Sequence, residues 1–269
     1  MTDAGFSNIY DDEIRANAYA KLECPGTYYL AYRDLPAIIS KHVQGRKALD
    51  FGCGAGRSTR FLRQLGFDVV GVDIAQPMLA RARECDPQGD YRLIPDGNLS
   101  SLSPETYDIV LCAFTFDNIP TMEKKVAIFR SLKPVGGIRA LSALTTMEKK
   151  VAIFRFLKRL LKGGGRIVNL VSAPEVYVNE WVSFSTKDFP ENRMARSGDK
   201  VRVTMLDVED RRPVEDILWT DEDYNEVYRR AELVPIATYR PLAKQSEPYS
   251  WVSETTIAPW VIYVLGHRE

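Results

Sequence analysis

The sequence is poor in the residues that most often build metal sites and disulfides. Its 269 residues include only two histidines, His42 and His267, and four cysteines. The cysteines, none of which forms a C-x-x-C pair, are Cys24, Cys53, Cys85 and Cys112. Neither a zinc site nor a disulfide framework is therefore expected. We predict no metal, and reduced thiols of the kind typical of a cytoplasmic protein.

An excess of charge of either sign and long apolar runs are also missing. Lysine plus arginine and aspartate plus glutamate each number 36, so the formal net charge is zero. No basic surface for nucleic acid or an anionic membrane is predicted. No stretch is apolar enough to span a bilayer, and the polar start, MTDAGFSNIYDDE, is not typical of a signal peptide. We expect neither nucleic acid nor a membrane as partner.

The most informative segment is residues 47–60, which read KALDFGCGAGRSTR. A short apolar strand ends in Asp50, and three alternating glycines, Gly52, Gly54 and Gly56, precede a helical pattern. Glycines at such a turn permit positive φ and a close approach of backbone to ligand. A second apolar strand ends in Asp73, about 17 residues after Gly56. An acid at this position typically binds a pair of ribose hydroxyls.

The spacing of the glycines distinguishes between ligands. The dinucleotide fingerprint G-x-G-x-x-G requires a glycine where this chain has Arg57. The pattern D-x-G-x-G-x-G instead resembles motif I of class I S-adenosylmethionine-dependent methyltransferases of the small-molecule type. The resemblance covers about residues 40–172 and 220–266. It implies S-adenosylmethionine as cofactor, S-adenosylhomocysteine as product, and a Rossmann-like, doubly wound α/β fold with a mostly parallel seven-stranded sheet.

The resemblance also implies roles for individual residues. The glycine turn is expected to face the methionine part of the cofactor, with Asp50 orienting it. Asp73 is expected to accept hydrogen bonds from the ribose hydroxyls, and Ile74 to pack on the adenine. Asp96 either binds the adenine amino group or caps a turn in PDGNLS. The cofactor-binding set is Asp50, Gly52, Cys53, Gly54, Gly56, Asp73, Ile74, Asp96, Gly97, Ala113 and Phe114. The set expected near the substrate is Tyr28, Phe116, Asp117, Asn118 and Trp181.

The chemistry of the small-molecule acceptor is poorly marked. Neither histidine lies at the carboxyl end of a predicted strand, so a histidine base is not expected. No N/D-P-P-Y/F run follows the fourth strand, which argues against the group of methyltransferases that methylates amino groups of nucleic acids. Proximity alone can supply much of the rate, so a base is absent or is Tyr28, Glu180 or Asp188. Oxygen, nitrogen and carbon acceptors remain open. A nicotinamide-dependent Rossmann oxidoreductase, disfavoured by the absence of a Y-x-x-x-K pair, and a non-catalytic cofactor-binding scaffold remain as alternatives.

We expect one domain over residues 1–269. Its parts are a tyrosine-rich helical lid broken at Pro25-Gly26 (1–40), a cofactor-binding core (41–172), a β-rich substrate-cap insertion (173–219), and a closing helix with antiparallel strands (220–269). The core strands are expected at 47–51, 67–73, 90–94, 107–114 and 165–172, followed by strands at 234–239 and 259–265. Helices are expected at 76–85 and 221–231. The cap is expected to contain two strands, in 201–209 and 213–219.

A near-exact internal repeat interrupts the core. Residues 121–133 and 146–158 differ only at Ser131 and Phe156. The fold needs one helix between its fourth and fifth strands, so we interpret the second segment as a recent or engineered tandem duplication. We predict that the second copy occupies this position, because it continues to the glycines 163–165, a typical helix stop. Either copy could occupy the position between the fourth and fifth strands, so the two copies could exchange there, or the protein could self-associate or swap domains through the duplicated helix.

Overall fold

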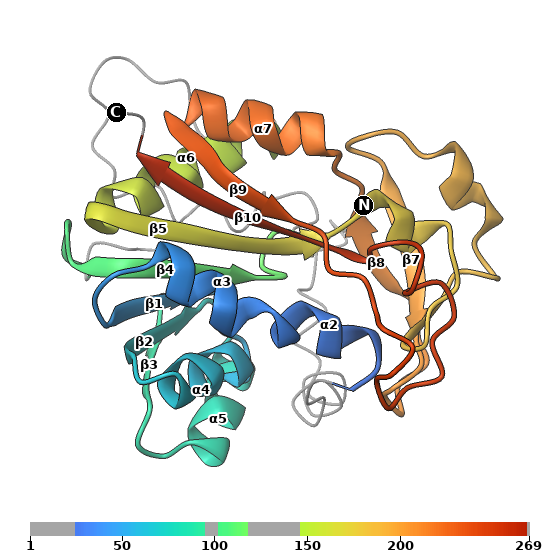
Figure 1. Ribbon diagram of the computed structural model, residues 1–269, viewed down its shortest axis with the longest axis horizontal. Coiled ribbons are helices and arrows are strands. Elements are labelled where there is room, and N and C mark those ends of the chain that lie inside the picture. The colour runs from blue at the N-terminus through green and yellow to red at the C-terminus, as the bar shows by residue number, and fades with distance from the viewer. Residues whose placement is uncertain (1–24, 95–101, 118–145, 268–269) are drawn as a thin grey trace, which may run out of the picture.

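The computed structural model describes residues 25–94, 102–117 and 146–267. They form a seven-stranded sheet in the order β3-β2-β1-β4-β5-β10-β9 (Figure 1). β1 to β5 run parallel, and β10 pairs antiparallel with both β5 and β9. The strands are β1 (Lys47–Phe51), β2 (Asp68–Asp73), β3 (Asp90–Leu93), β4 (Tyr107–Ala113), β5 (Leu161–Ser172), β9 (Leu233–Tyr239) and β10 (Trp260–His267). The predicted fold class is confirmed.

Helices cover both faces of this sheet. α6 and α7 lie on one face, and α3, α4 and α5 lie on the other (Figure 1). Their bounds, with those of α2, are α2 (Thr27–Arg33), α3 (Leu35–His42), α4 (Arg57–Gln64), α5 (Gln76–Cys85), α6 (Thr146–Leu160) and α7 (Asp221–Arg230). Side chains of a strand alternate between faces, so Val110 and Cys112 join the core under α6 while Ile109 and Leu111 join the core under α3. This two-sided burial explains the continuous apolar run of β4. None of the helices in these ranges combines the length and apolarity needed to cross a bilayer.

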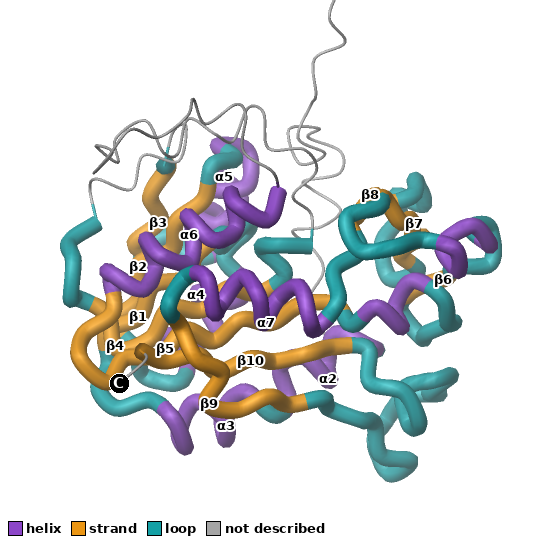
Figure 2. Tube along the Cα trace, turned by 90° about the horizontal axis from the view of Figure 1, so that it is seen from above, coloured by secondary structure: helices purple, strands orange, loops and turns teal. Residues whose placement is uncertain are grey.

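A small second sheet forms the cap between β5 and α7. Its antiparallel strands are β6 (Phe184–Ser185), β7 (Lys200–Met205) and β8 (Val214–Ile217), with the 3-10 helices η6 (Pro174–Tyr177) and η7 (Pro190–Met194). Sequence analysis expected the β7–β8 pair but not the two-residue β6. Figure 2 shows this sheet beside the end of the main sheet.

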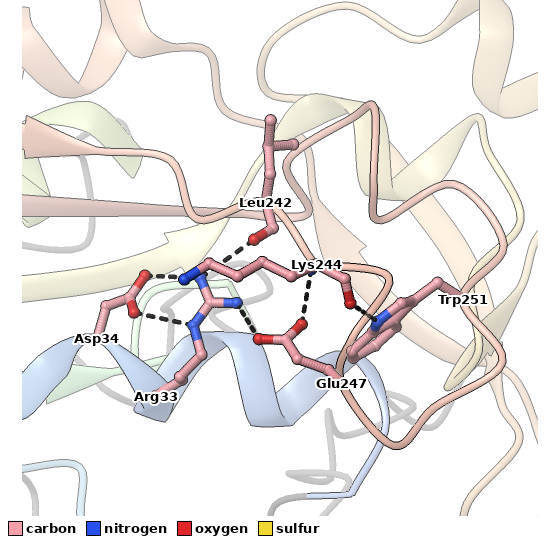
Figure 3. Close-up of polar contacts among 6 residues, drawn as sticks. All are labelled: Arg33, Asp34, Leu242, Lys244, Glu247 and Trp251. Carbon is pink, nitrogen blue, oxygen red and sulfur yellow. Dashed lines mark hydrogen bonds and ion pairs between the residues drawn. The ribbon is translucent and has the colours of Figure 1, made fainter.

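The end of α2 is tied to the long loop between β9 and β10 (Figure 3). The Arg33 guanidinium donates to both carboxylate oxygens of Asp34, to Glu247 Oε1 at 2.6 Å and to the Leu242 carbonyl at 3.1 Å. Glu247 in turn accepts from the backbone N–H of Lys244 at 2.8 Å. Because the guanidinium is planar, its hydrogen bonds to three residues fix the positions of those residues relative to one another. α2 is thereby held against the C-terminal part of the chain.

The second copy of the repeat forms α6, as predicted. Phe154 is fully buried, stacked on Phe116 at 4.7 Å between ring centroids and edge-on to Tyr228 at 5.1 Å. Phe156, which replaces Ser131 of the first copy, also packs against this core. The first copy, residues 121–133, lies outside the described residues.

The predicted end of this helix is wrong. α6 ends at Leu160, and β5 begins at the next residue, so Lys162 and the following glycines belong to a strand. The carbonyls of Arg159 and Leu160 accept hydrogen bonds from the backbone N–H groups of Glu105 and Thr106, at 3.0 and 2.9 Å. The turn before β4 thus supplies partners for two of the last carbonyls of α6.

Candidate active site

The glycine turn leaves β1 in a conformation that favours glycine. Gly52, Gly54 and Gly56 have φ values of 77°, 52° and 81°. A Cβ atom on Gly52 would lie 2.4 Å from Thr115 Cγ2, and one on Gly56 would lie 2.6 Å from the Tyr91 hydroxyl. Backbone conformation and close packing thus both exclude side chains here.

Asp73 fastens this turn to the end of β2. Its Oδ2 accepts from the Gly54 N–H and its Oδ1 from the Ala75 N–H, both at 2.8 Å. An ionised carboxylate accepts about four hydrogen bonds, so one group can serve both the turn and a ligand diol. Ile74, partly buried beside Asp73, packs against the core under α6.

Asp50 is completely buried behind the turn. Its Oδ2 accepts from the hydroxyls of Ser58 at 2.7 Å and Thr59 at 2.6 Å. Its Oδ1 has no hydrogen-bond partner among the described residues. Burial raises the pKa of Asp50 to about 6, although both hydroxyls oppose the shift. A positively charged group beside the turn would stabilise this carboxylate. Burial also raises the pKa of the Cys53 thiol well above its usual value, so Cys53 is not an activated nucleophile.

Arg57 places positive charge directly after the turn. It is the first residue of α4, and its guanidinium carbon lies 5.1 Å from the Tyr28 ring centroid and 5.3 Å from that of Tyr32. These are cation–π distances. Sequence analysis used Arg57 only as an argument against a dinucleotide site. The pairing with two tyrosines of α2 was not visible in the local pattern.

The residues after β4 connect the turn to a cavity. Phe114 has a φ of 59°, which a bulky residue rarely adopts, and such strain is typical of functional sites. Its N–H donates to the Leu170 carbonyl at 2.9 Å, and its ring lies 4.8 Å from that of Trp260. The Thr115 hydroxyl donates to the Phe51 carbonyl at 2.7 Å. The ends of β4, β5 and β1 are thereby locked together.

The cavity lies at the carboxyl ends of β4 and β5, under the cap. Asp117 Oδ2 accepts from the N–H and the hydroxyl of Ser172, both at 2.9 Å. From the cap, Asp216 Oδ2 accepts from the Tyr177 hydroxyl at 3.1 Å. Most other lining residues are apolar or aromatic. The lining consists of Tyr28, Phe114, Asp117, Ser172, Val176, Phe184, Val203, Met205, Val214, Asp216 and Trp260.

A buried lysine stands behind Asp117. Lys150 Nζ donates to the Phe116 carbonyl and the Tyr224 hydroxyl, both at 3.3 Å, and lies 4.1 Å from the Trp219 ring centroid. Burial lowers the pKa of Lys150 to about 7, and the nearby Asp117 carboxylate opposes that shift. Burial likewise raises the pKa of Asp117. Because Lys150 belongs to the duplicated segment, sequence analysis gave it no role.

The structure brings together only part of the predicted substrate set. Of that set, Tyr28 and Asp117 line the cavity; Phe114, which was predicted for the cofactor, lines it as well. Phe116 and Trp181 are buried in the two hydrophobic cores, and neither is among the described lining residues. Glu180 accepts from the N–H and hydroxyl of Thr186, and Asp188 is exposed; neither lines this cavity. Asp96, Gly97 and Asn118 lie outside the described residues.

Sequence analysis missed several lining residues. Asp216 and Trp260 sit in strands that were predicted as strands, but no local signal showed which of their side chains face the site. Ser172 ends β5, and only the position of a strand's carboxyl end marks it. These residues come from distant parts of the sequence, so their convergence depends on the fold.

Comparison with known families agrees with this geometry. A family model described as a methyltransferase domain matches residues 49–140. The match covers the glycine turn and the strands β2, β3 and β4. This match supports the resemblance to class I S-adenosylmethionine-dependent methyltransferases seen in the sequence.

Several curated relatives and solved structures similar to this chain are methyltransferases. Ubiquinone biosynthesis O-methyltransferases from Bordetella avium and Methylococcus capsulatus are 33% and 35% identical over 103 and 113 residues. These matches cover 37% and 40% of this chain and 43% and 48% of the relatives, so the chain spans less than half their length. The CcbJ methyltransferase from Streptomyces caelestis has a TM-score of 0.61 at 16% identity, covering 98% of this chain and all of that one. An S-adenosylmethionine-dependent methyltransferase from Clostridium acetobutylicum has a TM-score of 0.55 at 13% identity, covering 97% of each chain. These two likenesses show the fold.

Proposed function

We propose that this protein is an enzyme that transfers a methyl group from S-adenosylmethionine to a small-molecule acceptor. The observation that carries the proposal is the glycine turn, anchored on Asp73, beside a mostly apolar cavity at the same edge of the sheet. Ligands of open α/β sheets bind at the carboxyl ends of the strands. One ligand at the turn and another in the cavity would lie next to each other.

The residues of the turn fit the cofactor. The unpartnered Oδ1 of Asp50 and the backbone of the turn would hold the ammonium of the methionine part, and Arg57 offers positive charge for its carboxylate. Asp73 would hold the ribose hydroxyls, and Ile74 would pack on the adenine. When bound, S-adenosylmethionine supplies a methyl group on a positively charged sulfur, and an acceptor lone pair bonds to its carbon as the carbon–sulfur bond breaks. The protein contributes by aligning the acceptor and excluding water.

The N-terminal helices and the cap together are proposed to close the site and select the acceptor. Tyr28 from α2 and Phe184 from β6 line the same cavity, with ring centroids 5.2 Å apart. Behind them the buried Glu254 carboxylate accepts from the Thr27 hydroxyl at 2.7 Å and the Val182 N–H at 2.8 Å. This shared carboxylate supports a roof in which residues 1–40 and 173–219 act as one unit.

We also propose that the protein is cytoplasmic and that it self-associates. The free thiols Cys53, Cys85 and Cys112 suit a cytoplasmic enzyme. The repeat supports self-association, because either copy carries the apolar positions of α6 and could occupy a neighbour's core.

Calorimetric titration with S-adenosylhomocysteine and, separately, with NAD tests the cofactor assignment. We expect S-adenosylhomocysteine to bind with one-to-one stoichiometry and NAD to give no saturable heat. Methyl transfer from labelled S-adenosylmethionine to a panel of phenols, amines and carbon acids then tests catalysis. Preferential binding of NAD would support the oxidoreductase alternative. Binding of S-adenosylhomocysteine without transfer to any acceptor class would support the non-catalytic scaffold.

A further inference from the structure

Aromatic rings form one part of the acceptor cavity. The Trp260 ring centroid lies 4.8 Å from that of Phe114, 5.5 Å from Tyr28 and 5.7 Å from Phe184, and all four residues line the cavity. The faces of aromatic rings carry partial negative charge and attract organic cations. The Arg57 guanidinium already lies over the Tyr28 ring, so the rings of Phe114, Phe184 and Trp260 form the part of the wall that suits a ligand with apolar surface and positive charge.

A buried carboxyl oxygen in the same lining lacks a partner. Asp216 is 8% exposed, and its Oδ2 accepts from the Tyr177 hydroxyl, whereas its Oδ1 has no partner among the described residues. Leaving a buried acceptor unpaired costs free energy, which a ligand N–H can recover. Burial, and then the nearby Asp117 carboxylate, raise the pKa of Asp216 well above its usual value. A cation beside Asp216 would reverse this shift and stabilise the ionised form.

The charges around the cavity are unbalanced. Asp117 and Asp216 both line it, whereas the described lining includes no lysine, arginine or histidine. Among the described residues, Lys150 is a charged group that acts on Asp117, and Asp117 is the charged group that acts on Asp216. The described residues thus provide no cation that acts on Asp216. No cluster of three or more His, Cys, Asp or Glu side chains in the described ranges could hold a metal ion, so the geometry favours an organic cation.

We propose that the acceptor is a primary or secondary amine, which binds in this cavity as its ammonium ion and loses a proton to Asp216. This inference rests on the proposed methyl transfer. One N–H bond breaks, its proton bonds to Oδ1 of Asp216, and the electron pair stays on nitrogen as the nucleophilic lone pair. Asp216 then returns the proton to solvent. A carboxylate poised to ionise or protonate inside an apolar pocket is a suitable base for this step.

Three ligands of similar shape test the proposal: benzylamine, benzyl alcohol and benzoate. Each is titrated calorimetrically at pH 7.5 into protein saturated with S-adenosylhomocysteine, with catechol as a phenolic comparison. We expect benzylamine to bind at least about tenfold more tightly than benzyl alcohol, because a buried ion pair and cation–π contacts together exceed 1.4 kcal/mol. Asp216→Asn should remove this preference. Glu215→Gln is the matched control, since Glu215 is the preceding residue of β8 and is exposed.

The outcomes separate this inference from the proposed function. Equal affinity for benzylamine and benzyl alcohol, or tighter binding of catechol or benzoate, overturns the amine assignment while S-adenosylhomocysteine binding still supports a methyltransferase. If the unchanged protein does not bind S-adenosylhomocysteine, the result instead counts against the proposed function. If Asp216→Asn does not fold, the comparison of the four ligands on the unchanged protein decides the question.

Discussion

Replacement of Asp73 by asparagine tests the cofactor site most directly. The substitution keeps the shape of the side chain but removes its charge and converts one acceptor oxygen into a donor. Gly54 and Ala75 each present an N–H to this carboxylate at 2.8 Å, so one of these contacts becomes donor against donor. The remaining amide oxygen is also a weaker acceptor for ribose hydroxyls.

The size of the effect follows from these contacts. A hydrogen bond to a charged group contributes about 1.5–3 kcal/mol. Loss of one such bond should weaken S-adenosylhomocysteine binding by roughly 10- to 150-fold. Asp73→Ala should cost more, because both anchors of the turn are lost as well.

Calorimetry on matched variants measures this effect. Asp68→Asn is the control, because Asp68 begins β2, is exposed, and lies at the opposite end of the strand. Thermal unfolding without ligand reports whether the turn itself has been damaged. An unchanged affinity in Asp73→Asn would refute the ribose assignment, and equal weakening in Asp68→Asn would show a non-specific charge effect.

Two further variants test the core. Deletion of residues 121–145 should leave the melting temperature unchanged or higher, because the described core contacts of the repeat come from α6; a failure to fold would show that the first copy supports the structure. The pKa of Asp50 is about 6 in the folded chain against an ordinary 3.8, so the unfolded chain loses this proton at lower pH. The free energy of unfolding therefore falls as the pH rises from about 4 to about 6, by up to about 3 kcal/mol. Asp50→Asn should flatten this slope in urea unfolding measured from pH 4 to 7.5, and an identical slope would contradict the shifted pKa.

The duplicated helix shows where local sequence reasoning succeeds and fails. The second copy was correctly predicted to form the helix before β5, and its Leu157 and Leu160 are buried as their helical spacing favours. The end of the helix was misplaced by two residues or more. A glycine run is a local stop signal, but Glu105 and Thr106 supply a non-local cap that ends α6 earlier.

The sequence by itself determined the fold class and the glycine turn with Asp73, because strand periodicity, glycine conformation and the spacing of acids are local properties. Tertiary structure alone decided the cavity proposed for the acceptor. Asp216 from the cap, Asp117 after β4 and Tyr28 from α2 become neighbours only when the chain is folded. The raised pKa values of Asp117 and Asp216, and the unpartnered Oδ1 of Asp216, arise from burial and from charges distant in the sequence, which depend on three-dimensional packing and leave no periodic trace in the order of residues.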